Sequence, residues 1–415
     1  MVSSNKEVAF IDGIKGDFLF KSPLKHSLSV YSFAWESFDP ATQSGVFWTC
    51  SSDKSVHRYE VNLTEQTLSC TDTIPLIVDG IKPTIDEQVL GLSFDDGVLY
   101  AANLGGDFFK INTEERSFER WISGHRTSVQ SVHYDEESHV LITGGIDGSL
   151  CFWEIVEGEL KIKSRGTRVS QTSITAINYD YGQKRVTIAG HDALIRKFDF
   201  DPSTSSFLTD LEGQSCSTVS TEFGIEDSVF TGDYAVYVTD RGIVVLKEDK
   251  VVHNVDLYGC RRVALSNDGK TVVVGTVSGD LLVFDFCEGA LNQVQSESLS
   301  GDVTCLQFSI NNDLAVGLGN RKIFVFHKVD DKWTIRNSQF VFHLGRVNCL
   351  DFSPCGKFII SGGLDSCVFK WSLESPMKRV KVEQVHKLGV TCVKHVGNDM
   401  IVSGGQDGFL RLFKL

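Results

Sequence analysis

The sequence predicts an all-β fold built from repeated sheets, and two observations lead to this prediction. Phe (28 residues) and Gly (37) are abundant whereas Pro (7) and Met (3) are scarce, a composition that favours strands joined by tight turns. The chain also repeats itself, with clear copies of one unit at 124–155, 343–373 and 386–415. Weaker copies occupy 26–61, 86–112, 170–200, 221–249, 257–286 and 300–328.

Each unit is interpreted as three strands followed by an outer fourth strand. In the copy at 343–373, an alternating strand from Val347 leads to a turn with Pro354 and Gly356. The apolar run "FIISGG" and a tight turn at Asp365 follow, and the third strand ends at Trp371. The segment "MKRVKVEQ" then supplies the outer strand. Aromatic residues at the third-strand end recur about every 40–45 residues, the period of a WD-repeat propeller blade: Trp153, Phe198, Phe284, Phe326, Trp371 and Phe413.

The number of units predicts two domains. Nine units and a strand-like fragment at 6–12 exceed the four to eight blades of ordinary propellers. The last seven units, from Gly124 onward, are enough for one complete ring. We therefore predict an all-β fold with a seven-bladed WD-repeat β-propeller at 113–415, preceded at 1–112 by a partial second propeller.

The chain ends in a strand-like stretch, Phe409–Leu415, that needs an outer neighbour to complete its blade. In a ring of this kind, such a strand comes from the N-terminal side. We expect a strand from before residue 124 to pair with it. The segment "RSFERWIS" at 116–123 is the first candidate, and the first hundred residues are the other source.

Three units carry a His, a Ser or Thr, an Asp and an aromatic residue at the positions of the WD-repeat tetrad. These are His125, Thr143, Asp147 and Trp153; His343, Ser361, Asp365 and Trp371; and His386, Ser403, Asp407 and Phe413. The histidine is expected to bridge the turn Asp and the strand hydroxyl, at about 1 kcal/mol per hydrogen bond. A Ser, His and Asp together invite a catalytic interpretation, but their repetition in several blades favours a structural network. The sequence predicts no catalytic residues.

Charge and missing motifs exclude several function classes. A net charge of −14 argues against nucleic acid or anionic membranes as partners. No Walker-type "GxxxxGK[ST]", no C-x-x-C pair and no apolar run of the roughly 20 residues that span a bilayer occurs, so we expect no cofactor, no metal and no membrane insertion. The first residues lack a signal-peptide pattern, and 11 scattered Cys suit a reducing compartment, the cytoplasm.

A basic residue follows the blade-opening His in the three strong units: Arg126, Arg346 and Lys387. Loops at this position emerge on one face of a propeller. The three side chains are therefore candidates for a basic, partner-binding patch on an acidic protein. The alternative is ordinary solvated loop charge.

The order and detail of the units resemble the actin-interacting protein 1 family, a WD-repeat, two-propeller partner of cofilin. The resemblance rests on "GRVNCLDFSPCGKFIISGGLDSCVFKWSLESPMKRVKVEQVHKLGVTCVKHV", on "CSSDKSVHRYEV" and on the degenerate unit "YAVYVTDRGIVVLKEDKVVHNVD". It covers the later part of the family's pattern, including the C-terminal propeller. Most of the family's N-terminal propeller, where its actin and cofilin contacts largely lie, has no counterpart here, so no contact residue is carried over.

This resemblance implies a non-enzymatic, cytoskeleton-associated protein that binds actin filaments and promotes their disassembly with cofilin. A general WD-repeat scaffold for an unrelated complex is the competing interpretation. An enzyme would need a cluster of titratable groups in a pocket, and the sequence offers none outside the repeating tetrads.

Overall fold

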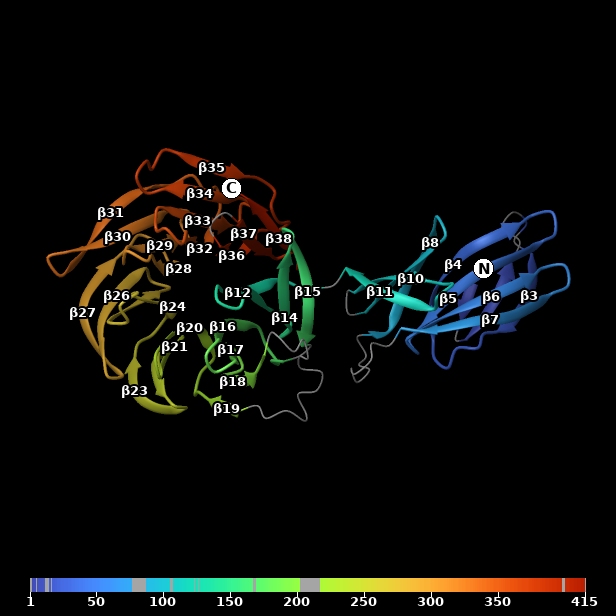
Figure 1. Ribbon diagram of the computed structural model, residues 1–415, viewed down its shortest axis with the longest axis horizontal. Coiled ribbons are helices and arrows are strands. Elements are labelled where there is room, and N and C mark those ends of the chain that lie inside the picture. Colours follow the sequence, from blue (N-terminus) through green and yellow to red (C-terminus); the bar gives the residue numbers. More distant parts are fainter. Residues whose placement is uncertain are drawn as a thin grey trace. The chain divides into compact units, whose positions relative to one another are not determined.

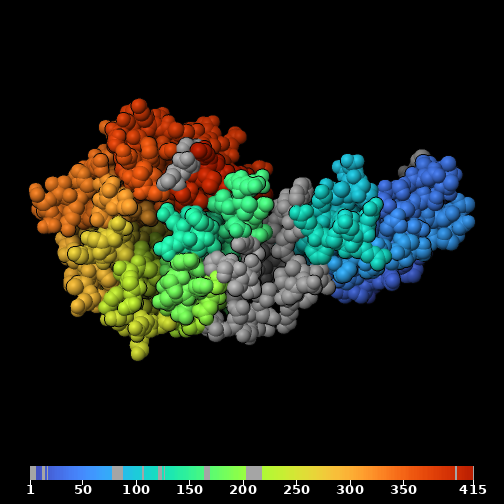
Figure 2. Space-filling view, viewed as in Figure 1, coloured from blue at the N-terminus to red at the C-terminus, as the bar shows by residue number. Residues whose placement is uncertain are grey.

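The computed structural model describes residues 2–4, 6–11, 15, 17–76, 87–104, 107–122, 124–125, 127–166, 169–201, 217–397 and 400–414. The chain forms two compact units, unit 1 (Met1–Gly124) and unit 2 (His125–Leu415), and each is described by itself (Figures 1 and 2). Among the described residues there is no helix of the length and apolarity that a membrane crossing requires.

Within the described residues, unit 2 contains seven antiparallel sheets whose strands follow one another along the chain (Figure 1). The first three sheets are β12 (Val129–Asp135), β13 (Val140–Gly145), β14 (Leu150–Val156), β15 (Glu159–Gly166); β16 (Ile174–Asp180), β17 (Arg185–Gly190), β18 (Leu194–Asp199), β19 (Ser217–Ser220); and β20 (Ile225–Thr231), β21 (Tyr234–Thr239), β22 (Gly242–Lys247), β23 (Lys250–Asp256). The next two are β24 (Cys260–Leu265), β25 (Thr271–Thr276), β26 (Asp280–Cys287), β27 (Ala290–Ser298); and β28 (Val303–Phe308), β29 (Leu314–Leu318), β30 (Ile323–Val329), β31 (Lys332–Phe340). The last two are β32 (Val347–Phe352), β33 (Phe358–Gly363), β34 (Val368–Ser372), β35 (Arg379–Val382); and β36 (Val390–Val396), β37 (Met400–Gly405), β38 (Leu410–Lys414).

The apolar cores of unit 2 lie between neighbouring sheets. One core joins Val316 and Phe326 of the fifth sheet to Val273 of the fourth, and the other sheet pairs are joined in the same way. Leu141 and Trp153 of the first sheet pack in one cluster with Val402 of the last, so the ring is closed. The prediction of a seven-bladed WD-repeat propeller is confirmed, and each four-stranded sheet is a blade.

Side chains of the innermost strands also bridge adjacent blades. Ser131 Oγ donates to the carbonyl oxygen of Ile174 at 2.8 Å, and Asn348 Nδ2 donates to the carbonyl oxygen of Val390 at 2.7 Å. The buried carboxylate of Asp351 accepts the backbone N–H of His395 at 2.8 Å. These bonds satisfy backbone groups near the centre of the ring and fix the first blade against the second and the sixth against the seventh.

Unit 1, where the sequence predicts a partial propeller, contains three antiparallel sheets within the described residues. It contains β1 (Val2–Ser4), β2 (Glu7–Ile11), β3 (Phe18–Pro23); β4 (Val30–Asp39), β5 (Ser44–Ser51), β6 (Ser55–Asn62), β7 (Thr67–Pro75); and β8 (Val89–Asp95), β9 (Val98–Asn103), β10 (Phe108–Asn112), β11 (Ser117–Ile122). Where the sequence suggests one leading strand at 6–12, the chain forms a three-stranded sheet. Phe10 of β2 and Phe20 of β3 stack at 4.8 Å and pack in one cluster with Phe47 of β5.

The expectation that 116–123 pairs with the C-terminal strand is wrong. β11 lies in this segment and pairs with β10 of its own unit, with Asn112 opposite Ser117. The turn explains the local pairing, because Asn112 Oδ1 accepts the backbone N–H groups of Glu114 and Glu115 at 3.1 Å each, which closes a tight hairpin. For the same reason the compact units divide after Gly124, one strand later than the boundary at 112 drawn from the sequence.

The last blade differs from the other six of unit 2. Its sheet has the order β36-β37-β38, and within the described residues β38 pairs with β37 alone. No strand of the part that the structure describes pairs with the other edge of β38, where the other blades of unit 2 carry a fourth strand.

Gly148, in the turn between β13 and β14, gives a first testable prediction. At φ +71° a Cβ there would lie 2.0 Å from the carbonyl oxygen of Ser170, whereas Gly158 at φ +82° has nothing within 4 Å of that position. Both alanine variants carry the same left-handed strain, but only Gly148→Ala must also displace backbone. We expect Gly148→Ala to lower the free energy of unfolding by about 2 kcal/mol more than Gly158→Ala. Urea unfolding measures this difference, and equal values would contradict it.

Candidate functional site

The tetrad of the sixth blade brings together four residues from two strands and two connections. His343 lies between β31 and β32, Ser361 on β33, and Asp365 in the turn between β33 and β34. His343 Nε2 lies 2.8 Å from Ser361 Oγ, and Nδ1 lies 3.0 Å from Asp365 Oδ2. Trp371 on β34 donates from Nε1 to the same Ser361 Oγ at 2.8 Å. The four side chains form one continuous hydrogen-bonded network.

The last blade repeats this arrangement with one change. His386 Nε2 lies 2.8 Å from Ser403 Oγ, and Nδ1 lies 2.8 Å from Asp407 Oδ1. Phe413 stands where the sixth blade has its Trp and has no N–H to donate. Arg411 adds a contact of its own, because its Nη1 donates to Asp407 Oδ2 at 3.0 Å and lies 2.6 Å from His386 Nδ1.

In the first blade of unit 2, a serine stands between the His and the Asp. His125 Nε2 lies 2.7 Å from Thr143 Oγ1, which also accepts Trp153 Nε1 at 2.8 Å. His125 Nδ1 lies 2.8 Å from Ser149 Oγ, and Ser149 donates to Asp147 Oδ1 at 2.6 Å. All four predicted residues are thus close together here as well.

A fourth set, which the sequence analysis missed, lies in unit 1. His26, just before β4, has Nε2 at 2.8 Å from Thr49 Oγ1 and Nδ1 at 2.9 Å from Asp53 Oδ2. Tyr59 on β6 takes the aromatic position, and its hydroxyl accepts the backbone N–H of Lys25 at 2.7 Å. Thr49 and Asp53 are separated by the same number of positions in the sequence as the hydroxyl residue and the Asp of the other sets. That spacing is the signal that would have found it.

Burial and hydrogen bonding act in opposite directions on the turn carboxylates. Burial raises the pKa of Asp365 and of Asp407, but hydrogen bonds from the histidine and from backbone N–H groups, together with the charge of the histidine, outweigh it, so both pKa values lie below the ordinary range. In the last blade, burial also lowers the pKa of His386. These carboxylates are therefore ionised at neutral pH and remain good acceptors.

The distances within each set resemble a nucleophile, a base and an orienting carboxylate. The surroundings do not suit that chemistry, because Thr143, Ser361 and Ser403 are all 0% exposed. Two of these hydroxyls also accept a Trp N–H. No substrate carbonyl can approach a hydroxyl in this position, so the networks act on structure.

Their effect reaches the surface through the residue that follows each His. In three of the sets, the turn Asp accepts the backbone N–H of the residue that follows the His. The pairs are Ser27 with Asp53 at 2.9 Å, Leu344 with Asp365 at 2.8 Å and Lys387 with Asp407 at 3.1 Å. The connection between two blades is thereby tied to a turn of the blade that it enters. The tetrads hold surface loops in fixed positions.

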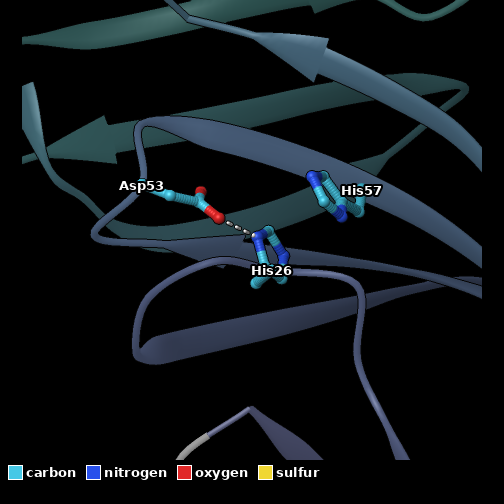
Figure 3. Close-up of side chains that lie close together, drawn as sticks. All are labelled: His26, Asp53 and His57. Carbon is cyan, nitrogen blue, oxygen red and sulfur yellow. Dashed lines mark hydrogen bonds and ion pairs between the residues drawn. The ribbon is translucent and has the colours of Figure 1, made fainter.

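One group of metal-ligating atoms occurs within the described residues, at His26, Asp53 and His57, whose ligand atoms lie within 4.8 Å of one another (Figure 3). The two imidazole rings are stacked, with centroids 3.8 Å apart and planes inclined by 14°. A metal ion must lie near the plane of each ring that binds it, and two stacked planes do not meet at one ion. Both nitrogens of His26 also have partners already. The group fits a buried network better than a metal site.

The predicted basic residues have different surroundings. Arg126 lies outside the described residues. Arg346 pairs with Asp302 at 2.8 Å, whereas Lys387 is exposed in the loop before β36. Arg346 and Lys387 lie on the connections that enter the sixth and seventh blades, so both are at the same end of their sheets.

A family model described as "WD domain, G-beta repeat" matches residues 116–154, 336–372 and 377–414. These three segments contain the three tetrads that the sequence analysis named. The match agrees with the observed sheets and with the hydrogen-bonded sets that they carry.

Curated relatives match a much larger part of the chain. The 66 kDa stress protein of Physarum polycephalum is 28% identical over 78% of this chain and 52% of its own length. Actin-interacting protein 1-2 of Arabidopsis thaliana is 23% identical over 80% of this chain and 54% of its own, and actin-interacting protein 1 of Caenorhabditis elegans is 24% identical over 84% and 56%. The chain thus spans about half the length of the curated relatives that it matches. The resemblance predicted from the sequence is confirmed: this WD-repeat propeller chain is similar to several proteins named actin-interacting protein 1, at 22–24% identity.

Proposed function

We propose that this protein binds actin filaments and, together with cofilin, promotes their disassembly without catalysing a reaction. The observation that supports the proposal is the similarity to proteins named for interaction with actin, which extends over both units and reaches 97% of the chain for the relative from Drosophila melanogaster. The role of cofilin in this proposal is supported by the resemblance of the repeat units to the actin-interacting protein 1 family. The proposed place of action is the cytoplasm, in association with the cytoskeleton.

The structure supports a mechanism based on binding energy. A ring closed between its first and last blades, with inter-blade hydrogen bonds and tetrad-held loops, keeps its surface in one arrangement. A rigid surface loses little conformational entropy on binding, so its contacts are available to favour one form of a partner over another. Filament disassembly driven by binding alone needs such a preference for one form of the filament over another.

A general WD-repeat scaffold remains the second candidate. The partial coverage of the relatives favours it, because the chain spans only 52–56% of the length of the three relatives described above. The two candidates differ in whether the chain recognises actin at all.

Co-sedimentation with filamentous actin, with and without cofilin, tests the proposal. We expect the whole chain to pellet with filaments and to pellet more strongly when cofilin is bound. Filaments followed by fluorescence microscopy should then sever or shorten faster with both proteins than with cofilin alone. If the chain stays in the supernatant in both conditions, the proposal is wrong and the scaffold interpretation stands.

A further inference from the structure

Three exposed leucines lie together at one end of the sixth and seventh blades. Leu344, Leu364 and Leu388 are 74%, 50% and 73% exposed. Their backbones are adjacent: a Cβ built on Gly345 would lie 3.3 Å from Leu364 Cβ, and one built on Gly389 would lie 3.2 Å from Leu364 Cδ1. We call Leu344, Leu364 and Leu388 the leucine patch. Contiguous exposed aliphatic side chains, unlike single ones, are typical of interaction surfaces.

The leucine patch is held in place by the tetrads. Asp365 accepts the backbone N–H of Leu344 at 2.8 Å, and Asp407 accepts the N–H of Lys387, next to Leu388, at 3.1 Å. Leu388 itself has φ +67°, a left-handed conformation that costs a non-glycine residue roughly 1–2 kcal/mol. The fold thus maintains local strain while it exposes an apolar side chain, a combination that is typical of binding sites.

The charges around the leucine patch indicate the chemistry of its partner. Arg346 and Arg411 border the patch and are compensated by Asp302 at 2.8 Å and Asp407 at 3.0 Å. Lys387 is exposed, and no carboxylate of the described residues forms an ion pair with it. With the Asp365 carboxylate, which accepts the N–H of Leu344, the named charges at the border balance, and Lys387 is the basic side chain that remains available to a carboxylate of a partner. A surface of this kind complements an apolar ridge flanked by acidic side chains.

We propose that the leucine patch is the surface through which unit 2 docks on an acidic partner, and, resting on the proposed function, that this partner is the actin filament. The leucines supply the apolar contact and Lys387 steers the approach. Because leucine contacts are lost on dissociation, truncating them raises the dissociation rate. Reversing a border charge mainly slows association and changes its salt dependence.

The test compares two triple variants of the whole chain in co-sedimentation with filamentous actin and cofilin. The first is Leu344→Ser, Leu364→Ser and Leu388→Ser. The control is Ile310→Ser, Val329→Ser and Met377→Ser, whose side chains are 59%, 46% and 64% exposed and lie at turns of the opposite sheet ends. Thermal unfolding establishes that both variants are folded. We expect the patch variant to bind at least tenfold more weakly than wild type, and the control to bind like wild type.

The outcomes separate the two proposals. If wild type does not pellet in any condition, the proposed function fails and the actin docking site fails with it. If wild type and the patch variant pellet equally, only the docking site is wrong. A second copy of the chain is the other occupant considered: a wild-type dimer that becomes monomeric in the patch variant, with actin binding unchanged, would also overturn the assignment. Lys387→Glu should reduce the salt dependence of binding, and an unchanged salt dependence contradicts the proposed steering role.

Discussion

Replacing His343 with alanine is expected to lower the free energy of unfolding of unit 2 by about 3–5 kcal/mol. The imidazole is 2% exposed and joins Ser361 to Asp365. Without it, the Asp365 carboxylate loses its strongest pKa-lowering partner, which opposes the effect of burial, and among the described residues the Ser361 hydroxyl keeps the Trp371 N–H alone. A buried carboxylate without its partner is much less stable than the intact pair.

His191→Ala is the matched control. His191 belongs to the same unit, but its side chain is 47% exposed and its partner Glu226 lies at 3.4 Å. Exposed ion pairs contribute about 0–1 kcal/mol, so we expect a small change. Urea unfolding of the two variants measures the contrast. A similar loss in both would mean that the tetrad contributes no more than a surface contact.

The second large effect concerns acid and the stacked pair in unit 1. Burial, and then the charge of the neighbouring His26, lowers the pKa of His57 from the usual 6.5 to about 4. The other charged groups that act on the ring are Asp53, which favours its protonation, and Lys25, which opposes it. Two imidazoles 3.8 Å apart cannot both carry a proton without strong repulsion.

The direction of the pH effect follows from these pKa values. In the unfolded chain His57 takes up a proton near pH 6.5, whereas in the folded chain it does so only near pH 4. Between these values the unfolded state binds more protons, so the stability of unit 1 falls as the pH drops from 6.5 towards 4. At the lower end the loss is on the order of 3 kcal/mol.

His57→Phe provides the comparison. His57 lies two residues before Tyr59, the aromatic residue of its tetrad. In the sixth blade Phe369 lies at the same position before Trp371, and the ring centroids of Phe369 and His343 are 4.6 Å apart. Phe is therefore compatible with a tetrad at this position. We expect the variant to lose the part of the acid sensitivity that wild type shows between pH 6.5 and 4. Thermal unfolding of both chains across this range measures it, and parallel curves would assign the sensitivity to other groups.

The parts of the fold that follow from local sequence pattern were predictable. Strand alternation, turn residues and the aromatic period identify most blades, because each depends on a short stretch of chain. The tetrad of unit 1 escaped because a long β4–β5 hairpin (Val30–Asp39 and Ser44–Ser51) separates His26 from Thr49, so its His–hydroxyl spacing differs from the other sets. The strand 116–123 was assigned to the wrong sheet because alternation does not say which edge a strand joins.

The leucine patch was not predictable from alternation either. Its residues come from two inter-blade connections and one turn, which the pattern treats as ordinary loops. Sequence reasoning singled out the charged members of the same loops, Arg346 and Lys387. The sequence does not show that Leu364, in the turn of the sixth blade, lies next to Gly345 and Gly389. These are the glycines that follow the exposed Leu344 and Leu388.

The cores between blades have a consequence for synthesis and truncation. Leu141 and Trp153, near the start of unit 2, are covered only when Val396 and Val402 arrive at its end. Until then a growing chain carries one finished stack of sheets with an uncovered apolar face at each end, and such faces invite aggregation. Loss of β36–β38 would reproduce that state permanently. The final strands thus decide whether the earlier blades close into a ring.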